Sequence, residues 1–174
     1  MNSPKTDTDL FARLDELGIA HRTYEHERVY TVGESQTGRG EMPGAHIKNL
    51  FLRDKKKNLV LATVEEDRDV DLKDLRKRVG SSGNYSFGKP ELLMEVLGVE
   101  PGSVTPLAVI NDVERRVTVV LDKAILEEEL VNAHPLRNDR TTAVTPQDLL
   151  SFLSAEGYDP VVLDFDQPAD EAAE

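Results

Sequence analysis

The sequence predicts an α+β fold, a single domain in which a mixed, mostly antiparallel sheet is surrounded by helices. Two observations indicate this. Pairs of β-prone segments are joined by short polar turns, as in hairpins, and amphipathic segments lie between these pairs rather than after every strand. A chain of 174 residues suits one domain with a substantial core. We therefore place the domain at residues 1–165 and expect residues 166–174 to be an acidic disordered tail.

The N-terminal elements follow from apolar spacing and loop composition. Residues 7–17 carry apolar side chains at helical spacing, with Thr8 or Asp7 as the N-cap. Residues 21–26 form a weak strand, and residues 31–44, rich in Gly, Ser and Thr, predict a long loop. Such long loops in compact domains are often functional.

The central part of the chain predicts a hairpin followed by two helices. Residues 50–53 and 58–64 are β-prone runs around a polar turn, with His46 and Lys48 near the start of the first strand. A helix begins near Asp71, residues 80–90 form a loop, and a second helix covers residues 91–97, between Pro90 and Gly98.

The rest of the chain adds short strands and a capped helix. The strands are short apolar runs at 107–110, 117–121, 131–134 and 161–165. Residues 124–129 predict a short helix. Thr145, followed by Pro146 and by Asp148 three positions after the cap, predicts the start of a helix that runs to about Glu156.

Composition and charge exclude several classes of function. The chain has no cysteine, which removes disulfides, thiolate metal sites and cysteine nucleophiles. It has no long apolar run and no signal peptide, so we expect a cytoplasmic protein without membrane contact. The net charge of −12, or −7 when the five carboxylates of residues 164–174 are subtracted, argues against a protein that coats nucleic acid.

The first candidate site residue is Lys48. A lysine inside a strand usually marks an exposed or edge position, but it could also project into a cleft and meet a phosphate or a developing oxyanion. His46, two residues earlier, is expected on the same face of the strand.

Two loops supply the other candidates. Residues 101–106, PGSVTP, are typical of a turn, yet backbone N–H groups after Gly102 can form an anion-binding concavity. His134 precedes a proline and is followed by a dense polar run, more than an ordinary hairpin turn requires. A surface loop remains the plain alternative there.

Motifs of other mechanisms are absent from the sequence. It contains no nucleophile elbow, phosphate-binding P-loop, dinucleotide fingerprint or H-E-x-x-H pair, and the four histidines lack metal-ligand spacing. We therefore expect no metal and no cofactor. The basic turn Lys55–Lys57 usually serves solubility, although it could meet a phosphate backbone.

Three motifs occur in this chain in the order HIKNLFLRDKKKN, the G-x-x-x-P loop GSVTP, and NAHP. This combination resembles the YbaK-type, prolyl-tRNA-synthetase-associated editing domains, most of all their freestanding ProX branch. The resemblance extends over residues 10–165. It implies a YbaK-like domain that hydrolyses the ester between a wrong amino acid and the 3′ end of tRNA(Pro), without metal.

The resemblance also implies roles for particular residues. Lys48 binds the terminal nucleotide and is needed for activity, Gly102 offers backbone N–H groups to the scissile carbonyl, and His134 shapes the amino-acid pocket. The residues expected to contact substrate are His46, Asn49, Ser103, Val104, Thr105, Pro106, Arg137, Asn138 and Arg140.

The substrate implied by the resemblance is the acceptor end of tRNA(Pro) that carries a small amino acid. The freestanding branch mostly clears alanine, and a pocket too small for proline would exclude it by size. Cys-tRNA(Pro) or another small aminoacyl ester, and a non-catalytic module that binds an amino acid or a tRNA end, remain alternatives. Transient contact with prolyl-tRNA synthetase or an elongation factor is a further expectation.

Overall fold

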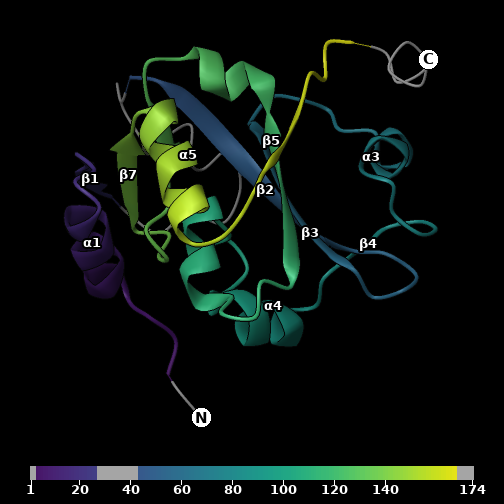
Figure 1. Cartoon of the computed structure of the whole chain (residues 1–174), viewed down its shortest axis with the longest axis horizontal. Coiled ribbons are helices and arrows are strands. Elements are labelled where there is room, and N and C mark those ends of the chain that lie inside the picture. The colour runs from purple at the N-terminus through teal and green to yellow at the C-terminus, as the bar shows by residue number, and fades with distance from the viewer. Residues whose placement is uncertain (1–2, 27–42, 168–174) are drawn as a thin grey trace.

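The computed structural model describes residues 3–26 and 43–167, which form one sheet with helices packed against it (Figure 1). The helices in this part are α1 (Asp7–Glu16), α3 (Leu72–Val79), α4 (Pro90–Leu97) and α5 (Pro146–Ala155), with 3-10 helices η1 (Pro106–Asn111) and η2 (Lys123–Glu127). The strands are β1 (Arg22–Glu25), β2 (Ala45–Arg53), β3 (Leu59–Glu65), β4 (Ser86–Phe87), β5 (Val117–Asp122), β6 (Val131–Ala133), β7 (Arg140–Val144) and β8 (Val161–Leu163). None of the described helices is long and apolar enough to cross a membrane.

The sheet is mixed, as predicted. Its order is β1-β7-β6-β2-β3-β5-β8, and β4 is attached to β2. The pairs β1/β7, β6/β7, β2/β3 and β2/β4 are antiparallel, whereas β2/β6, β3/β5 and β5/β8 are parallel. The α+β fold class is therefore confirmed.

Strand β2 has one complete and one interrupted edge. It pairs with β3 along residues 47–53. On the other side it meets β6 only at Ala45 and His46, and β4 only at Leu52 and Arg53. Within the described residues, positions 47–50 of β2 therefore have no partner strand on that side.

The two faces of the sheet bury different apolar clusters. Phe51 and Leu61 belong to the larger core, which includes residues of α4, α5 and η1. Leu52 and Val60, which alternate with them, pack on the other face against Leu75 of α3. Helix α3 thus covers the face opposite the larger core.

Most predicted elements are confirmed, including the hairpin, the four helices, the helix start near Asp71 and the cap at Thr145. The N-cap of α1 is Thr6, not Thr8 or Asp7, because Thr6 forms a reciprocal capping box with Asp9. The loop predicted at 80–90 contains the short strand β4. The predicted loop at 31–44 and tail at 166–174 lie largely outside the described residues.

The predicted strand at 107–110 is wrong. These residues form η1, whose first position is Pro106 and whose N-cap is Thr105, with Thr105 Oγ1 accepting a hydrogen bond from Leu107 N at 3.2 Å. Residues 106–110 are all buried, so the apolar run reflects burial on every side rather than strand alternation. A second prediction missed a strand. The polar run after His134 was expected to be a loop, but residues 140–144 form strand β7.

Candidate active site

Lys48 lies in the part of β2 that has no partner strand on one side within residues 3–26 and 43–167. Strand alternation places its side chain on the face that carries Leu52, together with that of His46. The side chain is half-buried, and among the described residues its ammonium group forms no hydrogen bond or ion pair. A half-buried cation without a protein partner is suited to meeting an anionic group of a ligand.

His134 follows the last residue of β6, the parallel neighbour of β2. The register pairs Ala45 with Val131 and His46 with Asn132. Paired residues of parallel strands share a face, so Asn132 lies on the face of His46 and Lys48. The pairing ends at His46 and Asn132, and His134 lies just past the end of β6. The structure therefore brings His46 and Lys48 onto one face of β2 and places His134 after the end of the neighbouring strand.

The surroundings of His134 keep its imidazole neutral. Nδ1 lies 2.9 Å from the carbonyl oxygen of Arg140, which can only accept a hydrogen bond, so Nδ1 carries the hydrogen and is the donor. Burial lowers the pKa of His134 below its usual range, and this outweighs the opposing effect of the Arg140 hydrogen bond. Nε2 then keeps its lone pair and can accept a hydrogen bond.

His26 is a neighbour of His134 that the sequence analysis did not place at the site. The two ring centroids are 6.3 Å apart, and His26 Nε2 lies 2.8 Å from Thr141 Oγ1. The proximity follows from the pairing of β1 with β7, which joins residues 115 or more positions apart. Local sequence carries no signal for it.

The glycine loop, residues 101–106, presents several backbone N–H groups. Gly102 has φ +91°, a conformation that favours glycine. Ser103 N–H donates to the carbonyl of Glu100 at 2.9 Å, but the N–H groups of Gly102, Val104 and Thr105 have no partner within the described residues. These three groups can serve as donors to a carbonyl oxygen or an anion.

Asn49 connects this loop to β2 from the face opposite Lys48. Its Nδ2 donates to the carbonyl oxygen of Val104 at 2.9 Å, and its Oδ1 accepts from Thr63 Oγ1 at 2.6 Å. Both ends of the amide are thus used within the protein. Asn49 therefore holds the glycine loop on the face of β2 opposite the side chain of Lys48.

The remaining loop residues expected to bind substrate have other partners. Ser103, Thr105, Pro106 and Asn138 are buried. Arg137 donates to both carboxylate oxygens of Asp139, at 2.8 and 2.6 Å. Arg140 pairs with Asp7 at 3.0 Å and with Glu25 at 3.4 Å. Neither arginine is therefore an unpaired cation at the site.

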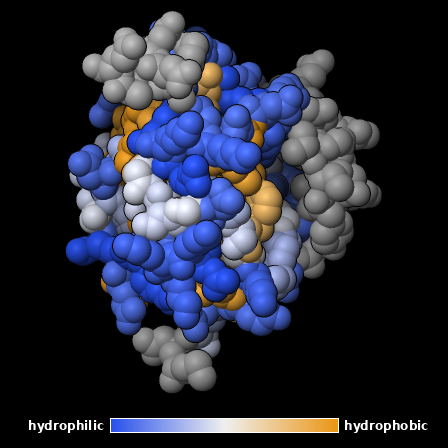
Figure 2. Space-filling view, turned by 90° about the vertical axis from the view of Figure 1, so that its right-hand side faces the viewer, coloured by the Kyte–Doolittle hydropathy of each residue, from blue (hydrophilic) through white to orange (hydrophobic). Residues whose placement is uncertain are grey.

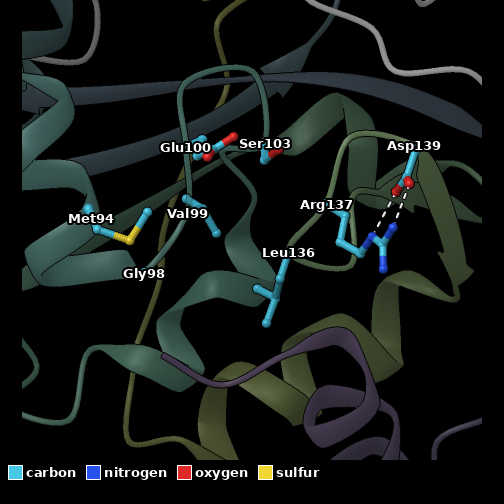
Figure 3. A pocket seen from close by; sticks show the side chains of 8 residues that line it. All are labelled: Met94, Gly98, Val99, Glu100, Ser103, Leu136, Arg137 and Asp139. Atoms are coloured by element: carbon cyan, nitrogen blue, oxygen red, sulfur yellow. Dashed lines mark hydrogen bonds and ion pairs between the residues drawn. The ribbon is translucent and has the colours of Figure 1, made fainter. Parts of the chain in front are cut away.

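A cavity of about 350 Å³ lies between the glycine loop and the connection from β6 to β7 (Figure 3). It is lined by Met94, Gly98, Val99, Glu100, Ser103, Leu136, Arg137 and Asp139. Ser103 and Arg137 thus meet here, in a cavity that Lys48 and His134 do not line. Leu136 has φ +70°, a strained conformation for a non-glycine residue, at the wall of this cavity.

Asn132 is a second residue that the sequence analysis missed. Its Nδ2 donates to the carbonyls of Pro43 and Ala45, while its buried Oδ1 has no hydrogen-bond partner among the described residues. Because it pairs with His46 in register, it shares the face of the candidate site. No group of three or more His, Asp or Glu side chains placed to hold a metal occurs in residues 3–26 and 43–167.

Comparisons with known proteins show the family to which the chain belongs. The family model described as aminoacyl-tRNA editing domain matches residues 26–152. The mouse prolyl-tRNA synthetase associated domain-containing protein 1 is 43% identical over 162 residues, which cover 91% of this chain and 95% of the relative. The prolyl-tRNA editing protein ProX of Acetoanaerobium sticklandii is 36% identical over 149 residues, which cover 85% of this chain and 90% of ProX.

A solved structure shares the fold. The crystal structure of a proposed trans-editing enzyme for prolyl-tRNA synthetase matches with a TM-score of 0.70 and 23% identity, covering 94% of this chain and 98% of that one. The family match spans most of the chain, and both relatives align over nearly their full length. The chain therefore belongs to the aminoacyl-tRNA editing domain family, in its YbaK/ProX-type branch.

Proposed function

We propose that the chain is a trans-editing deacylase that hydrolyses mischarged Ala-tRNA(Pro) and spares Pro-tRNA(Pro). Family membership supports the general reaction, and the names of the mouse and bacterial relatives favour tRNA(Pro). The observation that carries the proposal is the half-buried cation of Lys48, which has no protein partner among the described residues, on a strand whose parallel neighbour β6 is followed directly by the neutral imidazole of His134. The glycine loop, with its unpartnered N–H groups, borders the same part of β2.

Each group has a task in ester hydrolysis. Lys48 binds the terminal nucleotide and holds the ester in place. A water oxygen bonds to the ester carbon, and the negative charge that develops on the carbonyl oxygen is stabilised by N–H groups of the glycine loop, Gly102 first among them. The bond to the ribose oxygen then breaks, and that oxygen leaves with a proton.

The proton of the attacking water needs an acceptor. Nε2 of His134 has an available lone pair and is one candidate, and the adjacent hydroxyl of the ribose is the other. The groups required are nitrogen and oxygen donors and acceptors, so the reaction proposed here uses no bound metal. Discrimination against proline is a steric effect of a pocket that fits a methyl group but not a pyrrolidine ring.

The decisive experiment measures release of the amino acid from Ala-, Cys-, Ser- and Pro-tRNA(Pro) by the purified chain, with and without a chelator. We expect alanine to be released fastest, proline to be retained, and the chelator to have no effect. Faster release of cysteine than of alanine would mean that Cys-tRNA(Pro), not Ala-tRNA(Pro), is the preferred substrate. Binding of these tRNAs without release of any amino acid would indicate a non-catalytic module.

A variant connects the activity to the site. Lys48→Ala is expected to abolish turnover while its circular dichroism spectrum and melting temperature stay close to those of the wild type, because Lys48 supports no described hydrogen bond or ion pair. Loss of release in the presence of the chelator would overturn the mechanism.

A further inference from the structure

The hairpin turn and helix α3 carry a cluster of positive charge in an acidic chain. We define the basic surface as Lys55, Lys56 and Lys57 of the turn between β2 and β3, with Arg76 and Lys77 near the end of α3. The whole chain has a net charge of −12. Five cations lie in the turn and the last turn of α3, where the carboxylates are Asp54 in the turn and Asp74 one helical turn earlier, so the surface keeps a positive balance and can attract a polyanion locally.

Hydrogen bonds hold the turn and the end of α3 together. Lys55 N–H donates to the carbonyl of Ser82 at 2.8 Å, and Ser82 N–H donates to Asp54 Oδ2 at 2.9 Å. The aliphatic part of Lys55 lies so close to Gly83 that an added Cβ there would clash with Lys55 Cδ. The hairpin turn, β4 and α3 lie on one side of the molecule (Figure 1), and the surface on that side is mainly hydrophilic (Figure 2).

The cations of the basic surface lack the ion pairs that neutralise arginines elsewhere. Arg13, Arg68, Arg116, Arg137 and Arg140 each pair with a carboxylate. In the described part of the chain none of the five basic-surface cations does, and Arg76 donates only to the neutral amide of Asn84. Their charges are therefore available to phosphates of a partner.

Asp54 forms no ion pair with these five cations in the described part of the chain, because its carboxylate accepts hydrogen bonds within the turn. It is buried and accepts hydrogen bonds from the backbone N–H groups of Lys56, Asn58 and Ser82 and from the side chain of Asn58. Burial alone would raise the pKa of Asp54, but these hydrogen bonds outweigh it and lower the pKa. The carboxylate serves to shape the turn.

We infer that the basic surface binds the phosphate backbone of the acceptor stem of the tRNA whose 3′ end reacts at Lys48 and His134. This inference rests on the proposed function. Helix α3 packs through Leu75 on the face of β2 that carries Lys48, so one RNA molecule can contact both places from one side.

The distance along β2 fits this arrangement. Lys48 and Lys55 are seven residues apart, or roughly 23 Å of extended chain. Successive stacked nucleotides rise about 3.4 Å per phosphate. Phosphates about seven nucleotides from the reacting end, in the first base pairs of the stem, would therefore reach the basic surface. Phe87, paired with Leu52 and 62% exposed, offers an aromatic surface beside this path.

The test compares two triple variants that change the net charge equally. The test variant carries Lys56→Gln, Lys57→Gln and Lys77→Gln. The control carries Lys5→Gln, Arg116→Gln and Lys123→Gln, three cations outside the basic surface. We would measure kcat/KM at several salt concentrations on Ala-tRNA(Pro) and on an alanylated CCA trinucleotide, which has no stem.

On Ala-tRNA(Pro), we expect the test variant to lose at least about tenfold in kcat/KM at low salt. The slope of log(kcat/KM) against log salt should become shallower by about 0.9 for each phosphate that the variant no longer neutralises. On the trinucleotide both variants should match the wild type. Equal losses for the two variants on the full tRNA would overturn the inference.

Binding of uncharged tRNA(Pro), followed by fluorescence anisotropy, gives the same comparison without the reaction. A weaker Kd for the test variant than for the control supports the basic surface even if no ester is hydrolysed, and equal Kd values overturn it. Absence of hydrolysis by the wild type would contradict the proposed function alone, so the two failures are distinguishable.

Discussion

Asn49 bonds to the carbonyl oxygen of Val104 through its Nδ2, at 2.9 Å, and thereby fixes the glycine loop against strand β2. The amide is held in this orientation by Thr63, whose hydroxyl donates to Asn49 Oδ1 at 2.6 Å. Lys48 is the adjacent residue on the opposite face of the strand. The hydrogen bond therefore sets the position of the loop N–H groups relative to the cation that we propose binds the substrate.

Asn49→Ala should lower activity through this positioning. We expect kcat to fall by roughly 10- to 100-fold, because a loop displaced by about 1 Å no longer aligns its donors with the reacting carbonyl. The loss should appear in steady-state deacylation with little change in KM. Thr63→Ser, which keeps the hydroxyl, is the control and should retain most activity. Wild-type kcat in Asn49→Ala would contradict the positioning role.

Lys48 should be a residue whose loss affects activity but not stability. Lys48→Met keeps the length of the side chain and removes its charge, so we expect kcat/KM for Ala-tRNA(Pro) to fall by about 100-fold or more. Since the ammonium has no described protein partner, the free energy of unfolding in urea should change by less than about 0.5 kcal/mol. Lys48→Arg retains the charge and should keep more activity than the methionine variant.

The neutral state of His134 predicts a pH dependence of activity. Its folded-state pKa is lowered from the ordinary value of 6.5, mainly by burial. If Nε2 takes part in hydrolysis, kcat/KM decreases as the pH falls, and the midpoint of the decrease lies below pH 6.5. A midpoint above pH 6.5 would contradict this role for His134.

The same lowered pKa predicts a loss of stability in acid. Below pH 6.5 the unfolded chain binds a proton at His134 that the folded chain does not, so the free energy of unfolding decreases as the pH falls toward the folded-state pKa. Urea unfolding of the wild type and His134→Gln between pH 8 and 5 measures this. The free energy of unfolding of the wild type relative to that of His134→Gln should decrease as the pH falls below about 7.5 and be constant above it.

Period-two alternation was enough to predict that His46 and Lys48 share a face, because that relation depends only on a strand being present. The helix start near Asp71 and the cap at Thr145 were also predictable, because capping depends on residues within three positions. The position of His134 just past the end of β6 and next to strand β2 was not, since it depends on the parallel register of β2 and β6, segments 86 residues apart.

Contacts between residues far apart in sequence also determine the ion-pair and hydrogen-bond partners of other predicted site residues. Arg140 was expected to contact substrate, but it lies 133 positions from Asp7 in sequence and forms an ion pair with it. Asn49 was expected at the substrate, whereas Thr63 and Val104 occupy both ends of its amide. Nothing near these residues in sequence indicates those partners.

The last prediction concerns stability and involves Asp122, at the end of β5. Its carboxylate is fully buried, lies 2.6 Å from Arg68 Nε, and accepts hydrogen bonds from the N–H groups of Glu65 and Ala124. Arg68→Ala would leave this carboxylate without its counter-charge, and we expect a loss of about 3–5 kcal/mol in the free energy of unfolding.

A matched control separates the buried pair from the exposed one. Arg68 also contacts Asp166, at 3.1 Å, but that carboxylate is 76% exposed. Asp166→Ala should therefore cost no more than about 1 kcal/mol. Arg68→Met combined with Asp122→Asn removes both buried charges and should recover part of the loss, because no carboxylate is then buried without a partner. Equal losses in urea unfolding for Arg68→Ala and Asp166→Ala would mean that the buried carboxylate does not depend on its arginine.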